Sequence, residues 1–75
     1  MTLDQLKVGQ SATVSAITST GTMAQRIMQL GLLEGSDVAI KRKAISGDPI
    51  EISVLGYALS LRKNEASMVE VDNIK

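Results

Sequence analysis

The sequence predicts a mainly β protein: a small closed barrel of about five short strands, with one short helix and an N-terminal helical turn. Two observations lead to this fold class. The 75 residues are enough for one domain with one core. Short segments of alternating apolar and polar residues recur along the chain, separated by turn signals among its six glycines and one proline. Closing such a sheet would leave no exposed edge strand.

The N-terminal residues predict a helical turn followed by a strand. Thr2 and Gln5 have the spacing of a capping box, and Gly9 ends the turn. Residues 10–18 then alternate with the period of a half-buried strand. The side chains expected on the inner side of these two elements are Leu3, Leu6, Ala12, Val14 and Ala16.

A short helix is predicted over residues 23–30. Thr22 and Gln25 form a second capping-box pattern at its start, and Gly31 stands where a left-handed C-terminal cap belongs. The inner face of this helix should carry Met23, Ile27 and Leu30.

Four further strands should follow, because apolar residues again recur at every second position. They are expected at 37–43, 50–54, 57–61 and 69–71. The turns between them are expected at 46–49, 55–56 and 62–65, where the last could also form one helical turn.

The composition excludes several classes of protein. Hydrophobic residues make up 44% of the chain and charged residues 21%, which is typical of a globular domain. Eight basic and eight acidic residues give zero net charge, which argues against a binder of DNA or anionic membranes driven by bulk charge. Cysteine and histidine are absent, so no disulfide, thiol nucleophile or imidazole base is available. With Tyr57 as the only aromatic residue, the chain cannot build the platforms that stack nucleic-acid bases.

Charged residues and glycines suggest no specific site. The basic residues could grip phosphate or an acidic partner, but solvated strand ends explain them better. They are Lys41, Arg42, Lys43, Arg62 and Lys63. The carboxylates could hold a divalent metal only if turns gathered them, and no metal-loop spacing is present. They are Glu34, Asp37, Asp48 and Glu51. The glycines lack the phosphate-loop pattern, and nothing places a base beside a hydroxyl, so we expect no enzyme, cofactor or metal site.

Several segments, in order, resemble the FeoA family, and the resemblance covers nearly the whole chain. It begins with the spacing of Leu3, Leu6 and Gly9 and continues through Val14. Residues 26–38 read RIMQLGLLEGSDV, which is similar to the family's Arg-…-Leu-Gly-…-Gly-…-Val signature. Residues 47–50 read GDPI, and residues 59–66 read LSLRKNEA, which resemble its Gly-Asp-Pro turn and its Leu-Arg-Lys-x-Glu-Ala segment. The chain departs from the family at Glu34, often Pro, and at residues 45–46, often Pro-Leu or Pro-Phe.

The resemblance implies an SH3-like barrel with an inserted helix, spanning residues 1–75 as a single domain. It also implies a cytoplasmic accessory role in bacterial ferrous iron uptake, through contact with the membrane transporter FeoB. Two alternatives stay open: an SH3-like regulatory domain related to the C-terminal domain of metal-dependent repressors, and a weak ferrous iron carrier. The initiating Met1 and the lack of a helix-turn-helix segment favour the freestanding accessory protein.

The partner surface is expected at the end of the helix, formed by Arg26, Leu32 and Leu33. Adjacent leucines on a turn point apart, so the two are not expected to be buried together, and an exposed leucine could anchor a partner. The alternative is that both close the end of the barrel. We expect no nucleic-acid partner and no direct membrane insertion, since no apolar run approaches about 18 residues. Without a signal-peptide pattern at the N-terminus, a cytoplasmic location is expected.

Overall fold

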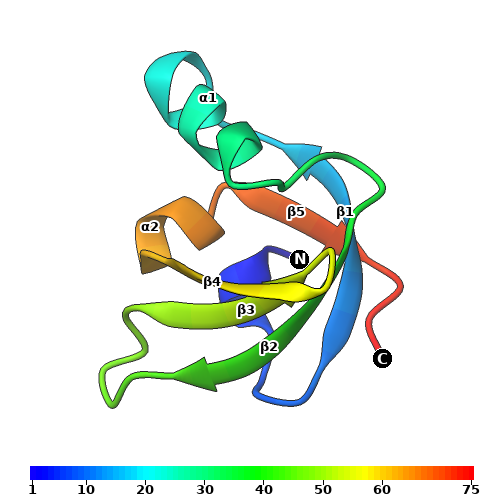
Figure 1. The fold of residues 1–75 in the computed structure, drawn as a ribbon, viewed down its shortest axis with the longest axis vertical. Coiled ribbons are helices and arrows are strands. Elements are labelled where there is room, and N and C mark those ends of the chain that lie inside the picture. Colours follow the sequence, from blue (N-terminus) through cyan, green and yellow to red (C-terminus); the bar gives the residue numbers. More distant parts are fainter.

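The computed structural model describes all 75 residues and contains five strands and three helical segments (Figure 1). In chain order these are the 3-10 turn η1 (Leu3–Gln5), β1 (Ser11–Ile17), α1 (Gly21–Gln29), β2 (Asp37–Lys43), β3 (Ile50–Val54), β4 (Tyr57–Leu61), α2 (Lys63–Ala66) and β5 (Val69–Asp72). All the predicted strands are therefore present, and the turn expected at 62–65 forms the short helix α2.

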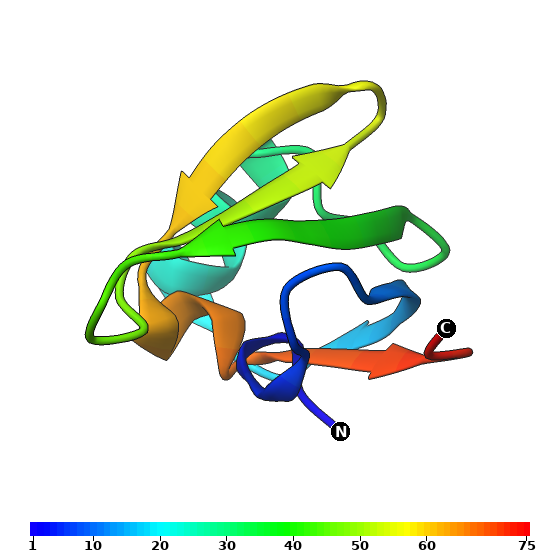
Figure 2. The ribbon, with the colours of Figure 1, turned by 90° about the horizontal axis from the view of Figure 1, so that it is seen from below.

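The strands form one antiparallel sheet in the order β4-β3-β2-β1-β5. The sheet curves strongly, as an SH3-like fold requires, but β4 and β5 do not pair, and Figure 2 shows them at opposite sides of the sheet. The prediction of a closed barrel is therefore wrong in this detail. The free edge of β5 instead receives the N-terminal residues, since the Val71 N–H donates to the Met1 carbonyl at 2.8 Å and Thr2 bridges to Glu70. The chain thus covers an edge strand without closing the ring.

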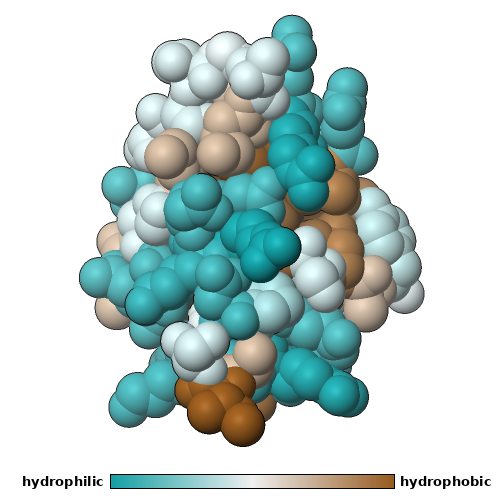
Figure 3. All heavy atoms as spheres, turned by 90° about the vertical axis from the view of Figure 1, so that its left-hand side faces the viewer, coloured by the Kyte–Doolittle hydropathy of each residue, from teal (hydrophilic) through white to brown (hydrophobic).

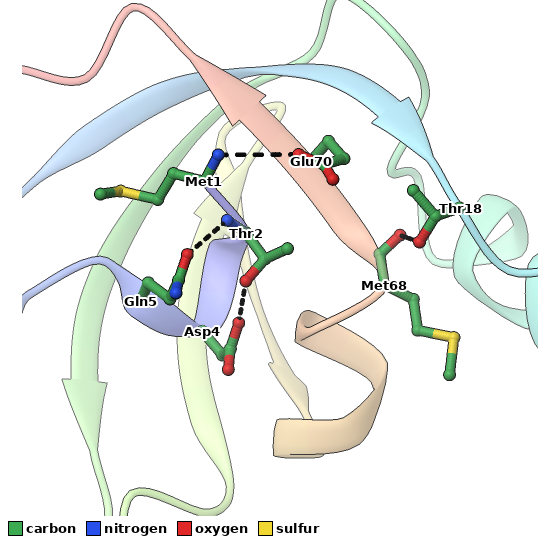
Figure 4. Close-up of polar contacts among 7 residues, drawn as sticks. All are labelled: Met1, Thr2, Asp4, Gln5, Thr18, Met68 and Glu70. Atoms are coloured by element: carbon green, nitrogen blue, oxygen red, sulfur yellow. Dashed lines mark hydrogen bonds and ion pairs between the residues drawn. The ribbon is translucent and has the colours of Figure 1, made fainter.

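The N-terminal residues are held against β5 by several polar contacts, which Figure 4 shows. The Met1 amino group lies 3.6 Å from a Glu70 carboxylate oxygen. The Gln5 side-chain oxygen accepts a hydrogen bond from the Thr2 N–H at 2.9 Å, as the capping-box spacing predicted. The Thr2 hydroxyl donates to Asp4.

The core consists entirely of aliphatic side chains, and every helix and strand contributes at least one of them. Its fifteen buried members are Leu3, Leu6, Ala12, Val14, Ile27, Leu32, Val38, Ile40, Ile50, Ile52, Val54, Leu61, Ala66, Val69 and Val71. Ala16, expected among them, is only half-buried, because the pairing of β1 with β5 shifts register between Val14 and Ala16. Such a bulge turns the following side chains away from the core.

Helix α1 begins at Gly21, earlier than the predicted residue 23. Pairing of β1 with β5 continues to Thr18, whose N–H and hydroxyl donate to the Met68 carbonyl at 2.8 and 3.1 Å (Figure 4). The helix starts soon after this pairing ends, with Thr20 as its N-cap, so the predicted capping box at Thr22 is wrong. Only Ile27 of the expected inner face is fully buried, while the other two side chains pack against the core in part.

Candidate partner-binding site

The end of α1 is fixed by a Schellman cap centred on Gly31. The Gly31 N–H donates to the Met28 carbonyl at 3.0 Å, and the Leu32 N–H reaches back to the Ile27 carbonyl at 3.4 Å. Gly31 has a φ of +99°, which only glycine adopts without strain, so its predicted role as a left-handed cap is confirmed. This cap sends the chain sharply away from the helix and sets the direction of the next two side chains.

Those two side chains, the adjacent leucines, point in opposite directions. Leu32 is 0% exposed and packs in the core with Ile27, whereas Leu33 is 51% exposed. The turn that carries Leu33 is rigid, because its N–H donates to the Ser36 hydroxyl at 3.2 Å and the Ser36 N–H donates to the Leu33 carbonyl at 3.0 Å. Leu32 must therefore be removed from the predicted partner surface, and Leu33 stays on it.

Leu33 belongs to an apolar groove between α1 and the end of β1. The groove encloses about 330 Å³, and its walls are made by Ile17, Ser19, Ala24, Met28, Leu33 and Glu34. The Met28 side chain is 45% exposed. The Ser19 hydroxyl oxygen is buried without a hydrogen-bond partner, which is unusual for a native protein. Sequence periodicity put Met28 only beside the helix stripe and gave no signal for Ile17, because the strand and the helix meet only in the tertiary structure.

Arg26 does not line this groove. Its Nε donates to a Glu65 carboxylate oxygen at 2.5 Å, while the other Glu65 oxygen accepts the Arg62 N–H at 2.8 Å. The Glu65 side chain is only 5% exposed and the Arg26 side chain 64%. Arg26 therefore joins α1 to α2 across the molecule, with part of its guanidinium left free. Sequence reasoning missed Glu65, although its place three residues after Arg62 matches a capping spacing.

The acidic residues expected as possible metal ligands do not converge on one site. Asp37 accepts the Thr13 hydroxyl at 3.0 Å, and Asp48 accepts the Lys63 N–H at 3.0 Å. Glu51 lies 3.5 Å from Arg42. No three of the acidic side chains gather as a group that could hold a metal ion. These carboxylates therefore act in strand and turn contacts.

None of the helices is long and apolar enough to cross a membrane. The chain contains no histidine or cysteine. The feature with the clearest capacity for recognition is thus the groove beside Leu33, an apolar hollow of the kind that receives a partner's side chain.

Comparison with solved structures identifies close relatives of this fold. An FeoA-like protein from Clostridium acetobutylicum is 33% identical with a TM-score of 0.90, over 96% of this chain and 84% of its own. FeoA of Stenotrophomonas maltophilia, described as a prokaryotic SH3 domain protein complexed with zinc, is 30% identical with a TM-score of 0.88, over 100% of this chain and 95% of its own. A manganese-dependent transcriptional repressor has a TM-score of 0.88 but 18% identity, over 96% of this chain and 35% of its own, which shows a shared fold alone.

Comparison of sequences leads to the same group. An Fe(2+) transport protein A/Fe(2+) transporter FeoB fusion protein from Porphyromonas gingivalis is 28% identical over 74 residues, which are 99% of this chain and 9% of that protein. This chain therefore spans about a tenth of the length of that relative. Residues 1–73 match the family described as FeoA domain. With nearly every residue matched and the fold shared with its members, the chain belongs to the FeoA domain family.

Proposed function

We propose that this protein is a non-catalytic accessory protein of bacterial ferrous iron uptake, and that it acts in the cytoplasm by contact with the membrane transporter FeoB. The support is the family match together with the Porphyromonas gingivalis relative, in which a matching segment and an FeoB transporter are parts of one chain. Fusion holds two domains at a high effective concentration, so selection for it favours domains that act together.

The observation that carries the contact mechanism is the groove beside Leu33. It offers partly exposed aliphatic side chains on a rigid frame, so a partner's side chain can bury apolar area there without ordering the turn first. Each fully buried Leu or Met side chain contributes about 1.5–3 kcal/mol. Leu33 and Met28 can therefore act as the apolar anchors of a modest interface, with Glu34 in the groove and the exposed part of Arg26 outside it as polar contacts.

The absence of histidine and cysteine supports a non-catalytic role. The serine and threonine hydroxyls have no imidazole to activate them. The two serine hydroxyls at the groove and its turn are not activated nucleophiles. The Ser36 hydroxyl accepts the Leu33 N–H, and the Ser19 hydroxyl oxygen is buried. Purified protein should therefore hydrolyse neither GTP nor ATP.

The test is a Leu33→Asp variant, with Val8→Asp as the matched control. Both positions are exposed aliphatic residues, 51% and 57%, but Val8 lies in the loop between η1 and β1, outside the groove. Each variant should keep the circular dichroism spectrum and melting temperature of the wild type. In a strain lacking the native gene, Leu33→Asp should fail to restore ferrous iron uptake and should no longer retain FeoB in a pull-down, whereas Val8→Asp should do both. A folded Leu33→Asp variant that supports normal uptake would show that the contact lies elsewhere.

A further inference from the structure

A second exposed apolar side chain lies far from the groove, on the loop between β2 and β3. Ile45 is fully exposed, with a relative accessibility of 110%. The loop around it is ordered by backbone hydrogen bonds, from the Ala44 N–H to the Pro49 carbonyl at 3.1 Å and from the Gly47 N–H to the Ala44 carbonyl at 2.7 Å. In Figure 1 this hairpin projects from the lower left of the molecule. Figure 3 shows apolar surface at that lower end, below a band of hydrophilic side chains.

Positive charge is concentrated at the same end of the molecule. The register of β2 with β3 brings Lys43 opposite Ile50, and Ile50 pairs with Leu61 of β4, so the start of α2 lies beside the loop. A hydrogen bond from the Lys63 N–H to Asp48 joins them directly. The basic residues at the end of β2 and the start of α2 are Lys41, Arg42, Lys43, Arg62 and Lys63. Two of them already have acceptors, since the Lys43 Nζ donates to the Asp4 carbonyl at 3.2 Å and the Arg42 Nε lies 3.5 Å from Glu51. The acidic ones are Asp4, Asp48 and Glu51, while Glu65 beside Arg62 is paired with Arg26 of α1.

The chain is therefore neutral but polarised. Five basic and three acidic residues at this end leave three basic and five acidic residues elsewhere, since the whole chain has eight of each. Zero net charge, which argued against an anionic partner, does not describe this end of the molecule. A local positive field acts on a surface within about one Debye length, roughly 8 Å at physiological salt.

We propose that the β2–β3 hairpin tip contacts the surface of an anionic phospholipid bilayer, with Ile45 in the interfacial region and the surrounding basic side chains against the lipid phosphates. The tip is convex, and its neighbours Ala44 and Ser46 are small, so it offers no cluster of apolar side chains from which a protein interface core is built. A bilayer needs only a protruding apolar side chain among basic ones.

This contact is weak by itself. One aliphatic side chain and an excess of two positive charges are less than the two strong signals that stable anchoring requires, so we expect half-saturation only at about millimolar lipid. The tip would therefore orient a protein that other contacts already hold at the membrane. The proposal revises the expectation that the protein makes no direct membrane insertion, but only by the depth of one side chain; it does not depend on contact with FeoB.

The absence of tryptophan from the chain allows a direct test. An Ile45→Trp variant would carry the only indole, at the proposed point of contact, and Leu33→Trp would carry it at an exposed position in the groove. Vesicles of phosphatidylglycerol should shift the Ile45→Trp emission to shorter wavelength, and vesicles of phosphatidylcholine should not. Leu33→Trp should remain unshifted with both. Adding Lys41→Glu to Ile45→Trp should raise the lipid concentration needed by about tenfold or more, since each basic residue near the surface contributes measurably to binding.

Several outcomes would overturn the proposal. Emission of Ile45→Trp that stays unchanged at millimolar phosphatidylglycerol would remove the contact. Equal shifts for Trp at positions 45 and 33 would mean adsorption without orientation. A shift produced by a soluble FeoB cytoplasmic domain, with none from vesicles, would assign the tip to a protein interface. None of these results bears on the uptake test of Leu33→Asp, so the two proposals can fail separately.

Discussion

The turn after α1 and the loop between β2 and β3 each expose one large aliphatic side chain, but they hold it in different surroundings. Leu33 lies in a concave frame with Ile17, Ala24 and Met28 beside it. Ile45 stands at a convex tip with charged residues behind it and only the small side chains of Ala44 and Ser46 beside it. Local hydrogen bonds hold both segments in place, so neither side chain is exposed through disorder.

The comparison shows that exposure alone does not specify a partner. A concave apolar frame can bury a partner's side chain on several sides, which gives a protein interface its specificity. A convex tip can bury its side chain only in a soft medium that closes around it, and the basic residues then select an anionic surface.

The two leucines of the turn after α1 give the largest contrast. Leu32→Asp should lose more than about 4 kcal/mol of unfolding free energy, because it leaves a cavity and buries an unpaired charge. A domain of this size has about 4–11 kcal/mol in total, so this loss removes a large part of its stability. Leu33→Asp should change the unfolding free energy by less than about 0.5 kcal/mol. Urea denaturation followed by circular dichroism measures both, and similar losses at the two positions would contradict their assignment to core and surface.

The Arg26–Glu65 ion pair, which joins α1 to α2, should give the next largest change in unfolding free energy. The two residues are expected to contribute unequally. Glu65→Ala should cost about 2–3 kcal/mol, because it leaves the Arg62 N–H and the Arg26 guanidinium without their acceptor. Arg26→Ala should cost about 1 kcal/mol or less, because Arg26 is largely solvated. The order of the two unfolding midpoints in a urea titration tests this. A larger loss of unfolding free energy for Arg26→Ala than for Glu65→Ala would contradict the prediction.

Each of the two regions contains a glycine with positive φ, so substitutions at these glycines allow a direct comparison. Gly31 and Gly47 both have positive φ, +99° and +82°, so alanine is strained at each, by about 1 kcal/mol or more. A Cβ at Gly31 would lie 2.5 Å from the Tyr57 hydroxyl oxygen, while a Cβ at Gly47 would meet open space. Gly31→Ala should also disturb the 3.2 Å hydrogen bond from the Tyr57 hydroxyl to the Leu30 carbonyl, and so cost about 1 kcal/mol more.

Thermal melting distinguishes the two glycine variants, since the shared strain cancels in their difference. Gly47→Val, which adds β-branching to the strained φ, should melt below Gly47→Ala. If Gly47→Val melts with the wild type, positive φ at this loop does not contribute to the stability of the fold.

The smallest effect is expected at Ser19. Its buried hydroxyl oxygen has no partner, so Ser19→Ala should leave the unfolding free energy unchanged or raise it by up to about 1 kcal/mol. Thr18→Val is a suitable control, since the Thr18 hydroxyl does donate to the Met68 carbonyl at 3.1 Å, and its loss should be mildly destabilising. A clear destabilisation by Ser19→Ala would show that this hydroxyl is hydrogen-bonded in solution.

Most of the fold could be predicted because its signals are local. Alternation with period two marks the strands, since successive side chains face opposite sides of a sheet. Gly31 could be identified as the helix cap because a left-handed residue at that position favours glycine over every other residue. The start of α1 was predicted too late, because Thr20 and Thr22 are both residues that can cap a helix, and the structure uses Thr20.

The sequence by itself therefore determined the elements, the aliphatic core and the absence of histidine and cysteine chemistry. Only the tertiary structure decided which of two adjacent leucines is buried, that Arg26 is bonded to Glu65, and that the N-terminal residues cover β5 in place of a closed ring. It also gathered the basic residues of β2 with those at the start of α2 beside Ile45. The physical reason is the range of the interactions: backbone dihedral preferences act over a few residues, whereas burial and charge pairing depend on segments that meet only after folding.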